Sequence, residues 1–100
     1  MPRDSGIHHV TAEQPVLVLG GGIAGMTAAW ELKRRGIPVR VIEATPHLGG
    51  RIHTVREGAG LVETGMQFYY SAYKQTNRLL REVGLFDQLV PIDVRGQIFW

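Results

Sequence analysis

The stretch Val16-Leu-Val-Leu-Gly-Gly-Gly-Ile-Ala-Gly25 decides how the beginning of this 100-residue chain folds. Its first four residues, Val16–Leu19, are all apolar, which is typical of a parallel strand buried on both faces. Three glycines, Gly20-Gly21-Gly22, end the apolar run, and helical spacing begins directly after them. The stretch therefore predicts a buried strand, a glycine-rich turn and the first residues of a helix.

The predicted helix continues to about Arg35 and is followed by Gly36, which suits the left-handed position after a helix end. Positive charge in the last helical turn opposes the negative end of the helix dipole, so the basic run is interpreted as a helix end and not as a nucleic-acid patch. That run is Lys33-Arg34-Arg35. The apolar side chains of the helix fall on one stripe, which consists of Ala24, Ala28, Ala29 and Leu32.

A second short apolar strand, Val39–Ile42, follows the helix, and Glu43 stands at its C-terminal end. Strand, helix and strand make up one Rossmann-like βαβ unit, so the predicted fold class is α/β. Parallel sheets are normally completed by further strands and covered on both faces. The parallel sheet of this chain is therefore expected to be incomplete, with exposed apolar edges.

Two further elements are predicted after the βαβ unit. The segments Ile52–Arg56 and Leu61–Glu63 flank two glycines and predict a β-hairpin. Helical spacing from about Ala72 to Gly84 predicts a second amphipathic helix, and one more turn is expected within Leu85–Leu89.

The remaining segments are predicted to be irregular. Residues 1–14 show neither helical nor strand spacing and are interpreted as a loose arm. Val90–Trp100 is interpreted as an extended segment. Aromatic residues that lead into an amphipathic helix are more typical of a core than of a cofactor platform, and this interpretation covers Phe68, Tyr69, Tyr70 and Tyr73.

Composition restricts the classes of function. The net charge of +2 is too small to indicate a nucleic-acid partner. The chain has no cysteine, which excludes disulfides, a thiol nucleophile and a cysteine-ligated metal centre, and which fits a cytoplasmic location. Neither a secretory signal nor an apolar run of the ~20 residues that span a membrane is present. Because the chain has no cysteine, redox chemistry would need a bound cofactor. No metal site is expected.

Gly20, Gly22 and Gly25 match the G-x-G-x-x-G pattern of dinucleotide-binding turns. Gly20 is expected to make the tight turn, Gly22 to let the backbone approach a pyrophosphate, and Gly25 to let the helix pack close to the strand. The helix that begins at Ile23 and Ala24 presents backbone amides and a positive dipole end. A diphosphate is the predicted occupant of this turn.

Glu43 lies eighteen residues after Gly25, at the end of the second strand, where a carboxylate accepts hydrogen bonds from the ribose of an adenosine. Its charge would repel a 2′-phosphate and so argues against NADP. The neighbouring Ala44 is included in the predicted site. Up to this point, the glycines and Glu43 fit an NAD-dependent dehydrogenase domain as well as a flavoprotein.

The element Leu48-Gly49-Gly50-Arg51 resembles the FAD-dependent amine oxidase superfamily, which includes protoporphyrinogen oxidases and phytoene or squalene-type desaturases. The resemblance covers Val16 to about Gln67 and implies FAD as the cofactor. It implies that Gly49 and Gly50 pass close to the diphosphate and that Arg51 offers a cationic fork to the phosphate oxygens.

The segment Glu63-Thr-Gly-Met-Gln67 resembles the next cofactor contact of the same superfamily. This resemblance adds Gly65, Met66 and Gln67 to the predicted cofactor-binding residues. In the superfamily, the substrate pocket and the residues that face the reactive ring lie in much longer C-terminal regions. No catalytic residue is therefore assigned to this chain.

Residues 15–100 are interpreted as a partial, truncated FAD-binding domain that needs a missing C-terminal half or a partner subunit. The expected parent protein is a flavin-dependent oxidoreductase acting on an amine, a porphyrinogen or an isoprenoid. Peripheral contact of the parent protein with a membrane is left open. Two alternatives remain at this level. One is a stand-alone nucleotide-binding module without catalysis, and the other is an NAD-dependent dehydrogenase domain, which leaves Gly49–Arg51 unexplained.

Overall fold

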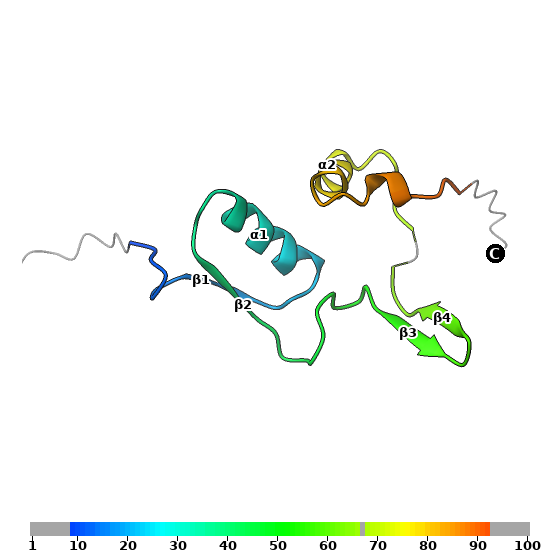
Figure 1. Ribbon diagram of the computed structural model, residues 1–100, viewed down its shortest axis with the longest axis horizontal. Coiled ribbons are helices and arrows are strands. Elements are labelled where there is room, and N and C mark those ends of the chain that lie inside the picture. Colours follow the sequence, from blue (N-terminus) through cyan, green and yellow to red (C-terminus); the bar gives the residue numbers. More distant parts are fainter. Residues whose placement is uncertain (1–8, 67, 93–100) are drawn as a thin grey trace, which may run out of the picture. The chain divides into compact units, whose positions relative to one another are not determined.

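The computed structural model of the chain describes residues 9–66 and 68–92 (Figure 1). They belong to two compact units, of which the first ends at Phe68 and the second begins at Tyr69. Most of the predicted extended segment at the C-terminus, and Gln67, lie outside the described residues. In the predicted N-terminal arm, Thr11 and Gln14 exchange backbone hydrogen bonds of 3.1 Å in a turn. The domain boundary at residue 14 stays a prediction.

The first unit contains the predicted βαβ arrangement. Strand β1 spans Val16–Leu19, helix α1 spans Ile23–Arg34 and strand β2 spans Val39–Ile42 (Figure 1). The two strands pair in parallel, with Val16 opposite Val39 and Leu19 opposite Ile42. Helix α1 packs against both strands. The predicted α/β class and the order of elements are confirmed.

The prediction that β1 is buried on both faces is wrong for the described residues. Burial alternates along β1 and β2 between half-buried and exposed side chains. The side chains of Leu17 and Leu19 are 55% and 78% exposed. Val18 lies on the other face, where its Cγ1 approaches the backbone of α1 at Gly25. A two-stranded sheet with one helix has only one covered face, and this explains the alternation.

Helix α1 ends as predicted. Its last turn holds Lys33 and Arg34, and the amide of Gly36 donates to the Lys33 carbonyl at 2.9 Å. The amide of Ile37 donates to the Leu32 carbonyl, also at 2.9 Å. This pair of bonds is the Schellman motif, which satisfies carbonyls that a helix end leaves without partners.

The predicted apolar stripe of α1 is only half correct. Ala29 is the buried residue of this helix and Leu32 is half-buried, whereas Ala24 and Ala28 are exposed. The packed face also includes Gly25, one turn before Ala29, where the helix backbone lies close to Gly20 and Val18. A glycine adds nothing to a count of apolar side chains, so the spacing alone did not mark this face.

The predicted hairpin is present and begins two residues later than expected. Strand β3 spans Thr54–Glu57 and strand β4 spans Gly60–Glu63, paired antiparallel with Glu57 opposite Gly60. A two-residue loop therefore joins the strands, which is a common hairpin connection. The amide of Thr64 extends the ladder by donating to the His53 carbonyl at 2.9 Å.

The second unit contains helix α2, Lys74–Glu82, and a short 3-10 helix, Phe86–Gln88. Both agree with the predicted helix and the additional turn. The amide of Leu85 donates to the Leu80 carbonyl at 2.8 Å, so α2 also ends in a Schellman motif. The guanidinium of Arg81 lies over the Phe86 ring at 4.0 Å from its centroid.

The aromatic residues before α2 do not form the predicted core. The side chains of Phe68, Tyr70 and Tyr73 are 56%, 66% and 52% exposed. Tyr69 is half-buried, and its hydroxyl donates to Oδ1 of Asn77 at 3.0 Å. One helix and one turn have too few side chains to cover several large rings, so aromatic spacing overestimated their burial.

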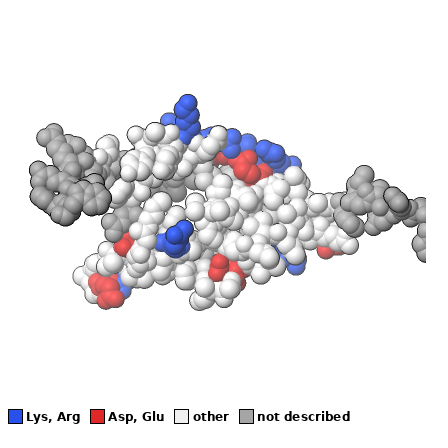
Figure 2. All heavy atoms as spheres, turned by 180° about the vertical axis from the view of Figure 1, so that it is seen from behind, with Lys and Arg blue, Asp and Glu red and all other residues white. Residues whose placement is uncertain are grey.

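Charged side chains of both signs are mixed on the described surface. On the face shown in Figure 2, Lys and Arg atoms lie next to Asp and Glu atoms. In α1, the carboxylate of Glu31 lies 3.2 Å from Arg34 and 4.0 Å from Arg35. Among the described residues, no helix is both long enough and apolar enough to span a membrane.

Candidate cofactor site

The glycine turn between β1 and α1 brings the strand end and the helix start into close contact. Gly20 has φ +99°, a conformation that L side chains rarely adopt. A Cβ atom on Gly25 would overlap the carbonyl oxygen of Gly20 and would lie 3.2 Å from Cγ1 of Val18. A Cβ on Gly22 would meet no atom within 4 Å. The turn is therefore closed toward the protein at Gly25 and open at Gly22.

The carboxylate of Glu43 reaches back to this turn from the end of β2. Its Oε1 accepts a hydrogen bond of 2.9 Å from the amide of Gly21. Its Oε2 accepts bonds of 2.7 Å from the amide and from the hydroxyl of Thr45. Three donors thus hold one half-buried carboxylate beside the glycine turn.

These donors stabilise the ionised form of Glu43. The amide of Gly21, followed by the amide and the hydroxyl of Thr45, lowers the pKa of Glu43 from 4.5 to about 2. Hydrogen bonds to a carboxylate favour its charged form. Glu43 therefore carries a full negative charge at neutral pH.

Acid is expected to remove the contribution of Glu43 to stability. Because its pKa is lower in the folded chain than the ordinary value, the contribution is complete above pH 4.5 and is lost as pH falls toward about 2. Glu43→Gln is therefore expected to lower the free energy of unfolding at pH 7 more than at pH 3. Urea unfolding of both proteins at the two pH values measures this difference. An equal effect at both values would contradict it.

The loop after β2 packs against the same glycine turn. The amide of Gly49 donates to the Gly21 carbonyl at 2.8 Å, and Gly49 forms a parallel bridge with Gly22. A Cβ on Gly50 would lie 3.2 Å from Cα of Gly22. Gly49 has φ +109°, so a side chain there would be strained. The structure therefore brings Gly49 and Gly50 directly onto the turn.

His47 precedes the two loop glycines in the chain and His53 follows them. Their rings stack on each other, with centroids 4.2 Å apart. The amide of Ile52 donates to the Gly49 carbonyl at 3.0 Å. These contacts join the two ends of the loop and hold the glycines between them.

The other predicted residues are less closely connected to the turn. A Cβ on Gly65 would overlap the carbonyl oxygen of Arg51, so the backbones of these two residues are in contact. The side chain of Met66 is 49% exposed. Arg51 is exposed, and so are Ile23, Ala24 and Ala44. Gln67 lies outside the described residues.

The start of α1 has the properties of an anion site. No side chain caps the helix at Gly22, and its first turn contains no acidic residue. The first amides of a helix have no intrahelical acceptor, and the helix dipole is positive at this end. Together with the open space at Gly22, this arrangement fits a diphosphate group.

Two residues of this arrangement were missed from the sequence. The amide of Gly21 donates to Glu43 and the carbonyl of Gly21 accepts from Gly49, so Gly21 links the Glu43 carboxylate to the loop. Thr45 contributes two of the three donors to Glu43. A hydroxyl residue two positions after a carboxylate is a signal for such a local hydrogen bond. Gly21 carries no comparable signal, because its role depends on a residue 22 positions away.

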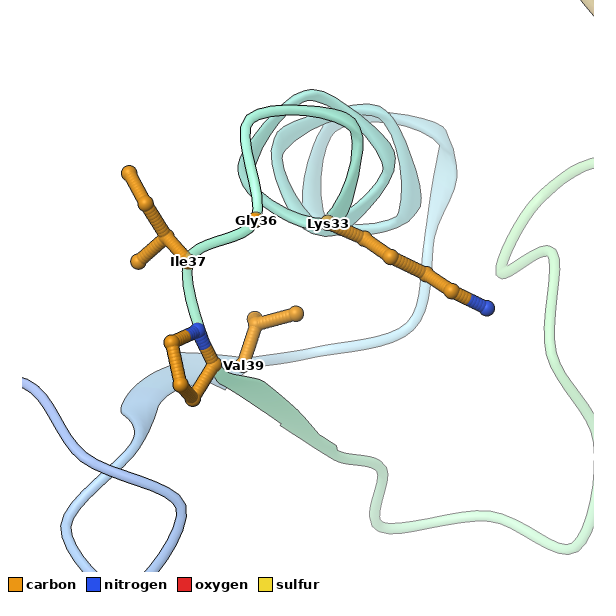
Figure 3. A pocket seen from close by; sticks show the side chains of 5 residues that line it. Lys33, Gly36, Ile37 and Val39 are labelled. Carbon is orange, nitrogen blue, oxygen red and sulfur yellow. The ribbon is translucent and has the colours of Figure 1, made fainter.

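A shallow hollow of about 430 Å³ lies elsewhere on the first unit (Figure 3). Its lining runs from Lys33 through Gly36 to Val39, at the junction of α1 and β2. Glu43 stands at the other end of β2. The hollow contains none of the predicted cofactor-binding residues.

Comparison with known proteins gives a consistent set of matches. The family model of flavin containing amine oxidoreductases matches residues 23–99. The chain is 39% identical over 75 residues to a coproporphyrinogen III oxidase of Propionibacterium freudenreichii subsp. freudenreichii, an alignment that covers 75% of this chain. It is 42% identical over 71 residues to flavin-containing amine oxidase A of Sus scrofa, and this alignment covers 70% of this chain. The chain spans 14% of the length of each relative.

Solved structures agree with these relatives. Wild-type putrescine oxidase bound to putrescine matches with a TM-score of 0.66 and 34% identity, over 70% of this chain and 16% of that protein. The resemblance inferred from Gly49, Gly50 and Arg51 is confirmed by these matches, as is FAD as the cofactor of the family.

Proposed function

Because this chain belongs to the flavin containing amine oxidoreductase family, we propose that it binds the ADP half of FAD at the glycine turn between β1 and α1. The observation that carries this proposal is the position of Gly21. Its amide holds Glu43 at 2.9 Å and its carbonyl accepts from Gly49 at 2.8 Å. One residue thus joins a ribose acceptor, a helix N-terminus and the glycine loop.

Each part of this arrangement has a separate role. The amides at the start of α1, around Ile23 and Ala24, bind the diphosphate, and the open space at Gly22 admits it. Glu43 accepts from a ribose hydroxyl. Gly49 and Gly50 bring the loop close to the diphosphate. The exposed side chain of Arg51 offsets the negative charge of the phosphates. Gly65, Met66 and Gln67 extend the same site toward the flavin end.

We propose that the whole protein is an FAD-dependent oxidoreductase. The bound flavin supplies the redox chemistry, whereas the protein supplies position and electrostatics. The residues described here hold the nucleotide end of the cofactor and do not select a substrate. The relatives include oxidases of a porphyrinogen and of L-tryptophan and a carotene desaturase, so an amine, a porphyrinogen and an isoprenoid all stay open as the substrate class.

A cofactor measurement tests this function. The purified protein is expected to show visible flavin absorption, and chromatography of the released cofactor is expected to identify FAD. FMN lacks the AMP part of FAD and carries only one of its two phosphates, so it is expected to bind far more weakly than FAD or ADP. A colourless protein that releases NAD or ADP would contradict the proposal, and so would equal binding of FMN and FAD.

Arg51→Ala is expected to weaken binding of both FAD and ADP while leaving adenosine nearly unaffected. The substitution removes a charged contact to the diphosphate, worth roughly 1.5–3 kcal/mol. Calorimetric titration with the three ligands measures the effect. Arg56→Ala, which removes an exposed cation from β3, serves as the matched control. An equal loss of adenosine affinity in Arg51→Ala would contradict the assigned role.

A further inference from the structure

The imidazole rings of His47 and His53 form a stacked pair at the two ends of the glycine loop. The ring centroids are 4.2 Å apart and the ring planes meet at 25°. Between them, Gly49 and Gly50 have φ values of +109° and +58°. Because glycine has no side chain, these two residues allow the backbone many conformations. A contact between the two ends of the loop therefore limits the conformations that the loop adopts.

The backbones of both histidines are held by neighbouring threonines. The hydroxyl of Thr45 lies 3.0 Å from the carbonyl oxygen of His47. The carbonyl of His53 accepts hydrogen bonds from the amide and the hydroxyl of Thr64, at 2.9 and 2.8 Å. The ring pair thus joins the segment that follows β2 to the base of the hairpin.

The charge of this pair depends on pH, because histidine is the side chain that ordinarily gains its charge between pH 8 and pH 5. The charged groups near the pair, among the described residues, have both signs. They are Glu43, which interacts electrostatically with His47, Arg51 within the loop, and Glu63 on the hairpin. The pKa of Glu43 is about 2, so its charge stays constant while the rings titrate.

We propose that His47 and His53 are positioning residues: their stack holds the glycine loop against the glycine turn at neutral pH, and protonation of both rings opens the stack and loosens the loop. A singly protonated pair can stay stacked, because an aromatic face attracts a cation. Two charged rings about 4 Å apart repel each other, which shifts the closing equilibrium roughly fivefold in water. The loop is therefore closed at pH 7.5 and is loosened as pH falls toward 5.

Hydrogen exchange of single amides, followed by NMR in the purified protein without ligand, tests the state of the loop. The amide of Gly49 donates to the Gly21 carbonyl at 2.8 Å and reports whether the loop is closed. Its protection factor, corrected for the intrinsic exchange rate at each pH, is expected to be roughly tenfold lower at pH 5 than at pH 7.5. The amide of Gly20, which donates to the Ile42 carbonyl at 2.7 Å, is the internal control and is expected to keep its protection.

Two substitutions of His53 separate ring stacking from charge. His53→Phe keeps a ring that stacks and removes one of the two charges, so the Gly49 amide is expected to stay protected at both pH values. His53→Ala removes the ring and is expected to lower the protection at pH 7.5 as far as acid lowers it in the wild type. His9→Phe removes an exposed histidine of the N-terminal arm and is the matched control, so it is expected to keep the wild-type pH profile.

The consequence for binding rests on the proposed diphosphate site and is measured with ADP-ribose. Both phosphates of this ligand are esterified, so the ligand itself does not titrate between pH 5 and pH 7.5. Loosening of the loop is expected to weaken ADP-ribose binding several-fold at pH 5 in the wild type but not in His53→Phe. Ring charge without loosening would instead strengthen binding of the anionic diphosphate.

Equal protection of the Gly49 amide at both pH values in the wild type would overturn the inference, and so would a pH profile that persists in His53→Phe. Tighter binding of ADP-ribose in acid would overturn it as well. If ADP-ribose binds at neither pH, the proposed function is wrong, while the exchange measurements still decide whether the histidine pair closes the loop.

Discussion

Replacing Glu43 with lysine is expected to lower the affinity for ADP and FAD by roughly a hundredfold, since a hydrogen bond to a charged group is lost. The substitution removes the acceptor for a ribose hydroxyl and places a cation where that hydroxyl must donate. It also leaves the amide of Gly21 without the carboxylate that it now bonds at 2.9 Å. Calorimetric titration of both nucleotides measures the loss.

The matched control for this variant is Glu57→Lys. Glu57 ends β3 and is exposed, so the same charge reversal is made away from the glycine turn. Its nucleotide affinity is expected to stay close to that of the wild type. Unchanged affinity in Glu43→Lys, or an equal loss in both variants, would remove Glu43 from the proposed site.

Gly25→Ala is expected to destabilise the βαβ arrangement of the first unit strongly. The added Cβ would overlap the Gly20 carbonyl oxygen and would lie 3.2 Å from Cγ1 of Val18, so α1 must move away from β1. Overpacking of this kind costs roughly 1–3 kcal/mol and occasionally more. The nearer contact is with a backbone atom, which cannot rotate away as a flexible side chain can, so we expect the upper end of that range. Urea unfolding of the purified protein measures the change.

Gly22→Ala separates stability from binding at the same turn. A Cβ on Gly22 meets no atom within 4 Å, so the free energy of unfolding is expected to fall by at most about 1 kcal/mol. Its affinity for ADP is nevertheless expected to fall, because the methyl group occupies the space assigned to the diphosphate. If Gly25→Ala were no less stable than Gly22→Ala, the proposed packing of helix on strand would be wrong.

The elements that could be predicted from the sequence are those with strong local signals. The apolar run before Gly20 predicted β1, and the β-branched residues before Glu43 predicted β2. Basic residues followed by a glycine predicted the end of α1. The two nearby glycines Gly58 and Gly60 predicted the hairpin, although its first strand begins at Thr54 rather than Ile52. Each of these signals depends on neighbouring residues alone.

The features that sequence reasoning missed depend on contacts across the fold. The packed face of α1 is set by Gly25, where the backbone itself approaches the strand and no side chain marks the position. Gly21 is one of three adjacent glycines, and only the fold shows that its amide meets Glu43. Exposure of Leu19 and Tyr70 depends on what covers them, which spacing along the chain does not specify.

A crystal structure of the protein with bound FAD tests the central claim most directly. The diphosphate is expected within hydrogen-bond distance of the amides that begin α1, above Gly22, with the ribose on the carboxylate of Glu43. Arg51 is expected to face the phosphate oxygens. An ADP half bound away from this turn, or a ribose that makes no contact with Glu43, would contradict the assignment of the site.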